Sequence, residues 1–355
     1  MIDLTAPTLS TDSNASPNPF FQADCLSLAP FSKEAILQLI TLARAIKSGF
    51  NPTLRHKKIA LLFNQTSTRT RSAFEVASFN LGAMTTYYDM GRSQMGEKES
   101  IEDTGAVLSR MYDLLVMRTD DHKMLKELHQ GASVPVINAM TDCNHPTQML
   151  ADLMTMLEET TTPLESIRLV FTGDASNNIA FSLAGLALKM GFTLYLVSPQ
   201  HYQMSEARCR VCDELTRALI ESGEGHGRVV EVESFSEIPN PDSIDFIYTD
   251  VWLSYDYSLE NWRPRIEALF PYQVNETVME HFPKAKLMHC LPAFHDGKTR
   301  VASELIEAFP ALKEGMEVTD AVFRSDRSIV MNEAENRMHA IEALLYATLF
   351  EEAFS

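Results

Sequence analysis

Long apolar segments and an export signal are both missing from this sequence of 355 residues. No apolar run approaches the roughly 18 residues that are needed to span a bilayer. The first residues, MIDLTAPTLSTDSNASPNPF, contain neither the basic nor the apolar region of a signal peptide. These absences predict a cytoplasmic protein that has no membrane partner.

Basic residues are also scarce. Lys and Arg number 30 against 48 Asp and Glu, which gives a net charge of -18. Because an excess of negative charge repels nucleic acids and anionic membranes, neither is expected as a partner. An anionic small substrate would therefore need a local group of basic residues.

The usual signatures of bound cofactors are incomplete. The segment GDASNN at residues 173–178 lacks the three glycines of a dinucleotide fingerprint. Cys209 and Cys212 have C-x-x-C spacing in a helical segment, but no second pair lies nearby. The five cysteines are odd in number and scattered, so reduced thiols are expected rather than a disulfide framework. We expect neither a metal nor an organic cofactor.

What the chain does contain is an alternation of helical and strand patterns. Residues 1–19 are rich in Ser, Thr, Asn and Pro, which predicts a flexible tail. Beyond the tail, short apolar runs typical of buried strands alternate with segments of helical periodicity. The predicted strands are residues 59–63, 85–88, 114–117, 134–138, 168–172, 193–197, 246–249 and 286–289.

This alternation predicts an α/β fold of two doubly wound parallel-sheet domains, with the active site between them. A Thr-rich joint near residue 160 gives a first domain of residues 20–160 and a second of residues 161–334. The terminal helix at residues 335–352 is expected to pack back onto the first domain. Ligands of such sheets bind at the carboxyl ends of the strands, so the residues that follow each strand are the candidates for chemistry.

A candidate phosphate site follows the strand at residues 59–63. The segment NQTSTRTR leads into a helical pattern, so hydroxyls, free backbone N–H groups and a guanidinium gather at a helix N-terminus. The alternative is an ordinary Ser/Thr helix cap beside two surface arginines. A similar helix start, HPTQ, offers His145 and Gln148 as donors to a carbonyl or phosphate oxygen, or is a capped helix with a surface histidine. Arg118 directly follows the strand at residues 114–117.

Two further candidates lie near the end of the chain. Cys290 follows the strand at residues 286–289, either as a nucleophile with His289 or His295 as its base or as a buried structural thiol. Arg337 opens the last helix and offers either another guanidinium for an anion or a structural ion pair.

Five motifs occur in order along the chain: STRTR, HPTQ, DVW after a strand, HCLP and ENRMH. Together they resemble the aspartate/ornithine carbamoyltransferase family, most closely its ornithine-specific members, from about Phe20 to Leu349. The resemblance implies a homotrimeric transferase of arginine metabolism that moves the carbamoyl group of carbamoyl phosphate onto the side-chain amine of L-ornithine, giving citrulline and phosphate. It also implies that residues 20–160 bind carbamoyl phosphate and residues 161–334 bind ornithine.

The resemblance assigns roles to individual residues. It implies phosphate binding by Ser67, Thr68, Arg69 and Thr70, with Gln94 supplied by a neighbouring subunit. It implies that the carbamoyl group and the leaving group are contacted by Arg118, His145, Gln148, Cys290, Leu291 and Arg337. Of these, the implied catalytic residues are Arg118, His145, Cys290 and Arg337. The implied ornithine site consists of Asn178, Asp250, Ser254 and Tyr255.

The sequence departs from the family pattern in the segment after DVW. Ornithine enzymes typically continue with a Ser-Met-Gly loop, whereas this chain has Ser254, Tyr255 and Asp256. The family's usual arginine after Gly-Asp-Ala is replaced by Ser176. A carboxylate at position 256 would suit a diamine such as putrescine, so putrescine or lysine is an alternative substrate. Two other interpretations of the sequence also remain: a non-catalytic regulatory relative, and an unrelated hydrolase centred on Cys290.

Overall fold

The computed structural model describes residues 18–64, 67–93, 95–223, 225–253 and 259–354. The predicted tail lies almost entirely outside these residues. The chain divides into two compact units: unit 1 is Met1–Met154 with Glu335–Ser355, and unit 2 is Thr155–Ala334. Both changes of unit fall within helices, the first in α5 (Pro146–Glu159) and the second in α12 (Val330–Leu349).

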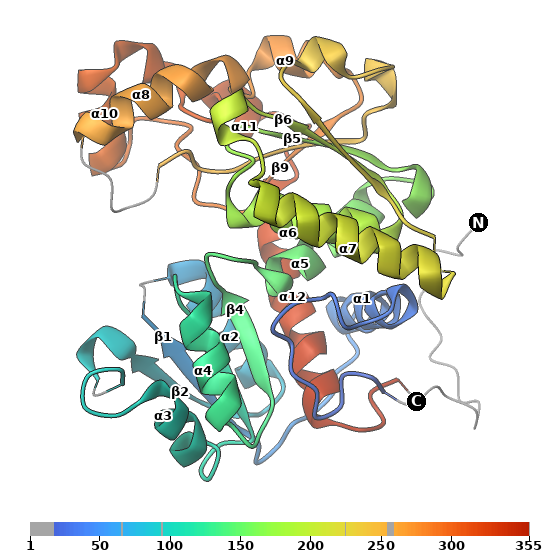
Figure 1. The fold of residues 1–355 in the computed structure, drawn as a ribbon, viewed down its shortest axis with the longest axis vertical. Helices are drawn as coiled ribbons and strands as arrows, with labels where there is room; N and C mark the ends of the chain where they lie inside the picture. The colour runs from blue at the N-terminus through green and yellow to red at the C-terminus, as the bar shows by residue number, and fades with distance from the viewer. Residues whose placement is uncertain (1–17, 65–66, 94, 224, 254–258, 355) are drawn as a thin grey trace. The chain divides into compact units, whose positions relative to one another are not determined.

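Unit 1 contains a four-stranded parallel sheet in the order β2-β1-β3-β4. Strand sequences such as KIALLF and LLVMR are apolar almost throughout and are buried, as expected for a parallel sheet covered on both faces. The elements that precede α5 are α1 (Lys33–Lys47), β1 (Lys58–Phe63), α2 (Thr68–Asn80), β2 (Met84–Asp89), α3 (Ile101–Leu108), β3 (Leu114–Arg118), α4 (His122–Gly131) and β4 (Val136–Met140). Figure 1 shows α3 beside α4, against which it packs.

Unit 2 contains a five-stranded parallel sheet in the order β7-β6-β5-β8-β9. Its elements before α12 are β5 (Arg168–Thr172), α6 (Asn178–Met190), β6 (Thr193–Val197), α7 (Glu206–Ser222), β7 (Arg228–Val232), β8 (Phe246–Thr249), α8 (Leu259–Leu269), α9 (Glu276–His281), β9 (Lys286–His289), α10 (Arg300–Ala308) and α11 (Asp320–Phe323). Unit 1 has one short 3-10 turn, at Met90–Arg92, within its described residues. The short 3-10 turns of unit 2 lie at Leu164–Ser166, Gln200–Tyr202, Phe235–Glu237, Pro241–Ser243, Phe270–Tyr272 and Pro310–Glu314.

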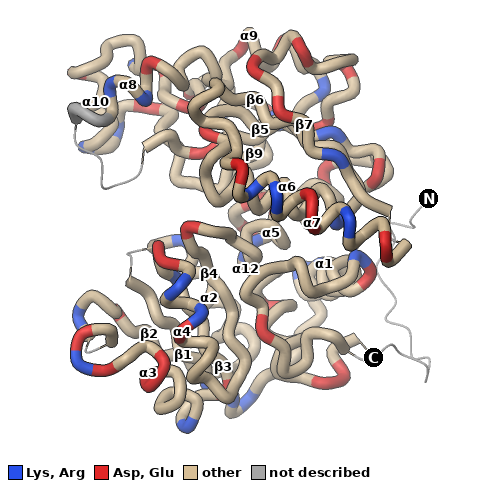
Figure 2. The backbone as a smooth tube through the Cα atoms, viewed as in Figure 1, with Lys and Arg blue, Asp and Glu red and all other residues tan. Residues whose placement is uncertain are grey.

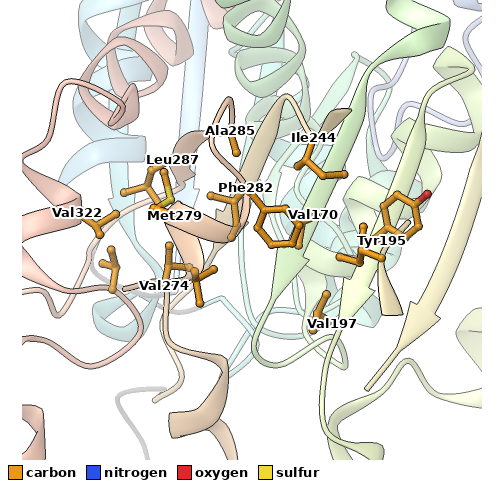
Figure 3. Packing of buried hydrophobic residues seen from close by; sticks show 14 of the residues in the cluster. Val170, Tyr195, Val197, Ile244, Val274, Met279, Phe282, Ala285, Leu287 and Val322 are labelled. Carbon is orange, nitrogen blue, oxygen red and sulfur yellow. The ribbon is translucent and has the colours of Figure 1, made fainter. Parts of the chain in front are cut away.

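One hydrophobic core cluster of unit 2 joins residues of its sheet to residues of α9, α11 and the segments around them. Figure 3 shows Val170 of β5 and Leu287 of β9 in one cluster with Phe282, which is fully buried. Burying a side chain of this size contributes roughly 1.5–3 kcal/mol to folding. This packing stabilises the sheet, from whose strand ends the candidate residues extend.

Every strand predicted from the sequence is present, with small differences at the ends, and the predicted α/β fold of two parallel-sheet units is confirmed. β7 was not predicted. Within the described ranges, none of the helices has the length and apolar character that a membrane span requires.

Each sheet has a point at which the chain reverses its direction of travel across the sheet. In unit 1 this point lies between β1 and β3, and in unit 2 between β5 and β8. Ligands of doubly wound sheets bind at such switch points, beyond the carboxyl ends of the strands. The segments after these four strands are thus the expected positions of ligand-binding residues.

Candidate functional site

In unit 1, the segment after β1 forms a capped helix N-terminus. Ser67 has extended backbone angles, and its hydroxyl accepts a hydrogen bond of 3.3 Å from the N–H of Thr70. Thr68 and Arg69 lie in the first turn of α2 beside it. Because the first N–H groups of a helix lack partners within the helix, this arrangement is suited to an anion.

Arg118 lies on the other side of the same switch point, as the last residue of β3. Its Nη1 donates a hydrogen bond of 2.8 Å to the hydroxyl of Thr70. The N–H of Asn64, directly after β1, donates to the carbonyl oxygen of Arg118 at 3.1 Å. These two contacts bring the predicted phosphate residues and Arg118 together at one edge of the sheet.

His145 and Arg337 meet inside unit 1. Both are buried, and Arg337 donates from Nη2 to Nε2 of His145. Since arginine can only donate, Nε2 must be the acceptor and the ring proton lies on Nδ1, where the Thr147 hydroxyl is 3.3 Å away. Burial, followed by the nearby charges of Arg337 and Arg118, lowers the pKa of His145 well below its usual value. The imidazole is therefore neutral at physiological pH.

Gln148 follows on the first turn of α5. Its Nε2 donates to Asp152 Oδ1 at 2.7 Å, and both side chains are buried. Asp152, one helical turn later, was not predicted as part of the site. An acidic residue four positions after a candidate glutamine on a helix is the signal that could have indicated it.

In unit 2, Asp250 connects the segments after β5, β8 and β9. Its Oδ1 accepts hydrogen bonds from the Cys290 thiol at 3.0 Å and from the N–H of Val251 at 2.8 Å. Its Oδ2 accepts from Nδ2 of Asn177 at 3.2 Å. Burial raises the pKa of Asp250, and the hydrogen bonds from Cys290 and Val251 oppose that shift.

Asn177 is a site residue that the sequence reasoning missed. The predicted Asn178 is the first residue of α6, whereas Asn177 is the N-cap, whose side-chain oxygen accepts from the N–H of Ala180 at 2.8 Å. The same side chain therefore caps the helix and reaches Asp250. The preference of helix N-caps for asparagine was the signal available in the sequence.

The turn after β9 is fixed by two buried glutamates. The N–H of Leu291 donates to Nδ1 of His289 at 2.9 Å, so the ring proton is on Nε2, which faces Glu317 Oε1 at 3.3 Å. The N–H of His289 donates to Glu333 Oε2 at 2.9 Å. Leu291 has φ of 58°, an uncommon conformation for a residue with a side chain. Both ring nitrogens of His289 are thus engaged away from the Cys290 thiol.

His295, the other base considered for Cys290, is also engaged. Its Nδ1 lies 2.6 Å from Asp320 Oδ1, and its ring stacks on Phe323 with centroids 3.8 Å apart. The thiol of Cys290 is instead directed to Asp250. This geometry does not form the cysteine–histidine pair that a thiol hydrolase requires.

Several predicted residues cannot be placed. Gln94, Ser254 and Tyr255 lie outside the described residues, as does Asp256. Among the described residues, two groups bring metal-ligating atoms close together: one is Asp250, His289 and Cys290, and the other is His295, Asp296 and Asp320. In the first group these atoms are occupied by the hydrogen bonds above.

Comparison with known families covers nearly the whole chain. Residues 23–158 match the carbamoyl-P binding domain of aspartate/ornithine carbamoyltransferases, and residues 165–348 match the Asp/Orn binding domain. The catabolic ornithine carbamoyltransferase of Burkholderia pseudomallei is 43% identical over 331 residues, which is 91% of this chain and 96% of the relative. The ornithine carbamoyltransferase of Haemophilus influenzae strain PittGG is 41% identical over 91% of this chain and 97% of its own.

Solved structures agree. The ornithine carbamoyltransferase from Pyrococcus furiosus superposes with a TM-score of 0.77 at 33% identity, covering 93% of this chain and 98% of its own. The anabolic ornithine carbamoyltransferase from Campylobacter jejuni has a TM-score of 0.77 at 30% identity and covers 91% of this chain and 97% of its own. Sequence, fold and the placement of residues after the strands thus agree, and the chain belongs to the aspartate/ornithine carbamoyltransferase family.

Proposed function

We propose that this protein transfers the carbamoyl group of carbamoyl phosphate to the side-chain amine of L-ornithine, giving citrulline and phosphate. The observation that carries the proposal is the meeting of Arg118 with Thr70 at the capped N-terminus of α2. A guanidinium, hydroxyls and the N–H groups of a helix start there match the phosphate of the donor substrate. The ornithine carbamoyltransferases among the relatives support the choice of acceptor.

On the carbamoyl phosphate side, the chain supplies positive charge and hydrogen-bond donors. We assign Ser67, Thr68, Arg69 and Thr70 to the phosphate. Arg118 and Arg337 both lie close enough to His145 to lower its pKa. The neutral imidazole adds no third positive charge, so the two guanidiniums remain matched to the dianionic substrate and its departing phosphate. His145 and Gln148 are assigned to the carbamoyl group.

On the amine side, the attacking nitrogen must lose a proton as the new C–N bond forms and the C–O bond to phosphate breaks. Asp250, which is half-buried and accepts a hydrogen bond from the Cys290 thiol, is the assigned acceptor for hydrogens of the amine. Asn178, Ser254 and Tyr255 complete the proposed ornithine site, and Cys290 and Leu291 are assigned to the carbamoyl group. No covalent enzyme intermediate is needed, because carbamoyl phosphate is already activated and approximation alone can contribute about 7–11 kcal/mol.

We also propose that the protein is a cytoplasmic homotrimer that acts in arginine metabolism, with Gln94 completing the phosphate site of a neighbouring subunit. Large apolar side chains are exposed on unit 1: Phe79 is 81% exposed, and Val76 lies one turn before it on α2. Met84, at the start of the adjacent β2, is also exposed. Such a group of exposed apolar residues is typical of a subunit contact. If a Phe79→Glu variant sedimented as a trimer of the same mass as the wild type, this group of residues would not be the subunit contact.

The first test is an assay of the purified protein with carbamoyl phosphate and, separately, ornithine, putrescine, lysine and aspartate. Formation of the ureido product with ornithine as the preferred amine supports the proposal. Preference for putrescine or lysine would assign the segment around Asp256 to specificity instead. The absence of product with all four amines would favour a different amine substrate or a non-catalytic relative.

Variants of the proposed phosphate site test whether the measured carbamoyl transfer depends on it. Arg69→Ala and Arg118→Ala are each expected to lower kcat/KM for carbamoyl phosphate by about 10²–10³-fold while the protein stays folded. Arg110→Ala, on the exposed turn after α3, is the matched control and should retain activity. Near-normal turnover of both site variants would refute the proposed use of the α2 N-terminus.

A further inference from the structure

The turn between β5 and α6 is held by an arginine from another helix. Arg208 lies in the first turns of α7 and donates from Nη1 to the carbonyl oxygens of Ser176 and Asn177, the latter at 2.9 Å. Its guanidinium also lies over the ring of Phe181, 5.2 Å from the centroid. Arg208 thus contacts both the end of the turn and the first turns of α6.

Asn177 depends on this contact for part of its backbone bonding. Its carbonyl oxygen accepts from the N–H of Phe181 at 3.4 Å, which is long for the first bond of a helix. The bond from Arg208 to the same oxygen is shorter, and it is charge-assisted. The orientation of Asn177 at the start of α6 is therefore fixed from the α7 side.

The side chain of Asn177 connects this turn to Asp250, on the proposed amine side of the site. Its Nδ2 donates to Asp250 Oδ2 at 3.2 Å, and Asp250 Oδ1 accepts from the Cys290 thiol at 3.0 Å. The contacts form a continuous series from Arg208 through Asn177 and Asp250 to Cys290. Every member lies in unit 2.

Arg210, a second arginine of α7, makes a different contact. Figure 2 shows residues of both signs along α7. Arg210, two positions after Arg208, is largely exposed and lies 3.6 Å from Glu206 in an ion pair within the same helix. Such exposed pairs contribute about 0–1 kcal/mol. Arg210 therefore supplies a control for the charge and position of Arg208 on the helix.

We propose that Arg208 is a positioning residue for the amine substrate: by holding the backbone of Ser176 and Asn177, it keeps the Asn177 amide on Asp250. The inference rests on the proposed function and adds a residue of α7 to its amine side. Arg208 does not touch the reacting atoms. Its effect on turnover is exerted through Asn177.

The kinetic test compares Arg208→Ala, Arg208→Lys and Arg210→Ala. Arg208→Ala should raise KM for ornithine about tenfold and leave KM for carbamoyl phosphate unchanged, because small displacements of a positioning group are costly. Arg208→Lys keeps one cationic donor for the two carbonyls and should recover part of the loss. Arg210→Ala should match the wild type. An Arg208→Ala variant that only melts earlier, with both KM values unchanged, would show that Arg208 is merely structural.

A double-mutant cycle tests the route through Asn177. If Arg208 acts through that side chain, Arg208→Ala combined with Asn177→Ala should raise KM for ornithine no more than Asn177→Ala alone. Additive effects in the double variant would overturn the proposed route.

Hydrogen exchange separates this inference from the proposed function. Amides of residues 174–181 should exchange several-fold faster in Arg208→Ala than in the wild type or in Arg210→Ala. Inactivity of the wild type with ornithine would overturn the proposed function and leave this exchange result to decide whether Arg208 holds the turn. Unchanged exchange in Arg208→Ala would overturn the positioning role itself.

Discussion

Arg118 of β3 donates a hydrogen bond of 2.8 Å to the hydroxyl of Thr70 on α2, across the point at which the sheet of unit 1 reverses direction. Thr70 is almost fully buried, and its N–H donates to the Ser67 hydroxyl. One threonine therefore connects the helix cap with the guanidinium. The proposed phosphate site depends on this residue for its geometry as well as for its hydroxyl.

Replacing Thr70 by valine removes the hydroxyl but keeps the shape of the side chain. We expect Thr70→Val to lower kcat/KM for carbamoyl phosphate by about 10–100-fold, because the site loses a hydroxyl and Arg118 Nη1 loses the acceptor that Thr70 provides. Thr70→Ser keeps the hydroxyl and should lose only a few-fold. Steady-state kinetics with carbamoyl phosphate as the varied substrate provide the measurement. Equal losses in the two variants would mean that the hydroxyl has no special role, and a larger loss in Thr70→Ser than in Thr70→Val would mean that the methyl group matters instead.

The buried His145 should make stability depend on pH. Its pKa is lowered on folding, so below about pH 6.5, its usual value, the unfolded chain binds a proton that the folded chain excludes. The contribution of His145 to stability is therefore complete above that pH and falls as the pH drops below it, by at most about 1.4 kcal/mol per pH unit.

Urea unfolding of the wild type and of His145→Gln at several pH values between about 7.5 and 5.5 tests this sign. The wild type should lose more stability over that range than the variant, which cannot titrate at this position. His201→Gln, at an exposed position, is the control and should follow the wild type. Parallel curves for the wild type and His145→Gln would contradict the lowered pKa.

Gly173, directly after β5, should not tolerate a side chain. Its φ is 117°, and a Cβ atom would lie 2.9 Å from Nε1 of Trp252, which is fully buried. Gly173→Ala should therefore destabilise the protein by about 1–3 kcal/mol and displace the turn that leads to Asn177. Gly185→Ala, in α6 with open space at its Cβ, should instead stabilise by about 0.5–1 kcal/mol. Thermal denaturation of both variants gives the comparison, and similar melting temperatures would contradict the predicted clash.

The sequence was sufficient for the strands because most are apolar runs buried on both faces. β7 escaped this criterion because RVVEV contains two charged residues and forms the half-buried edge of its sheet. α8 was likewise not predicted, because it contains Pro264 and proline normally interrupts a helical pattern.

In the candidate site, too, some residues could be predicted from the sequence and others could not. Residues that follow strands, such as Arg118, Asp250 and Cys290, could be predicted because parallel strands place their carboxyl ends at one edge. Their partners could not be predicted, because Asn177 meets Asp250 only through the order of strands in the sheet, and Arg208 meets the turn after β5 only through the packing of α7. Pairings between residues that are distant in the sequence are properties of the folded chain.

One carboxylate oxygen of Glu317 accepts hydrogen bonds from two donors, one on the backbone and one on a histidine ring. It is fully buried, and its Oε1 accepts from Nε2 of His289 at 3.3 Å and from the N–H of Phe294 at 2.5 Å. Within the described part of the chain, its Oε2 has no hydrogen-bond partner. A glutamine keeps one acceptor oxygen and places its amide group where Oε2 now lies.

Glu317→Ala should therefore leave both donors unsatisfied, at roughly 1–3 kcal/mol each, and loosen the turn that carries Cys290 and Leu291. We expect lower stability and at least a tenfold loss of kcat/KM for ornithine in Glu317→Ala, and a smaller loss of both in Glu317→Gln, which keeps the acceptor oxygen but buries an amide group where, among the described residues, Oε2 has no partner. Glu276→Ala, which removes the acceptor of a 3.0 Å hydrogen bond from Thr319 on the same segment, controls for general loosening. If Glu317→Gln were as impaired as Glu317→Ala, the negative charge of Glu317, and not its hydrogen bonds, would be what the turn requires.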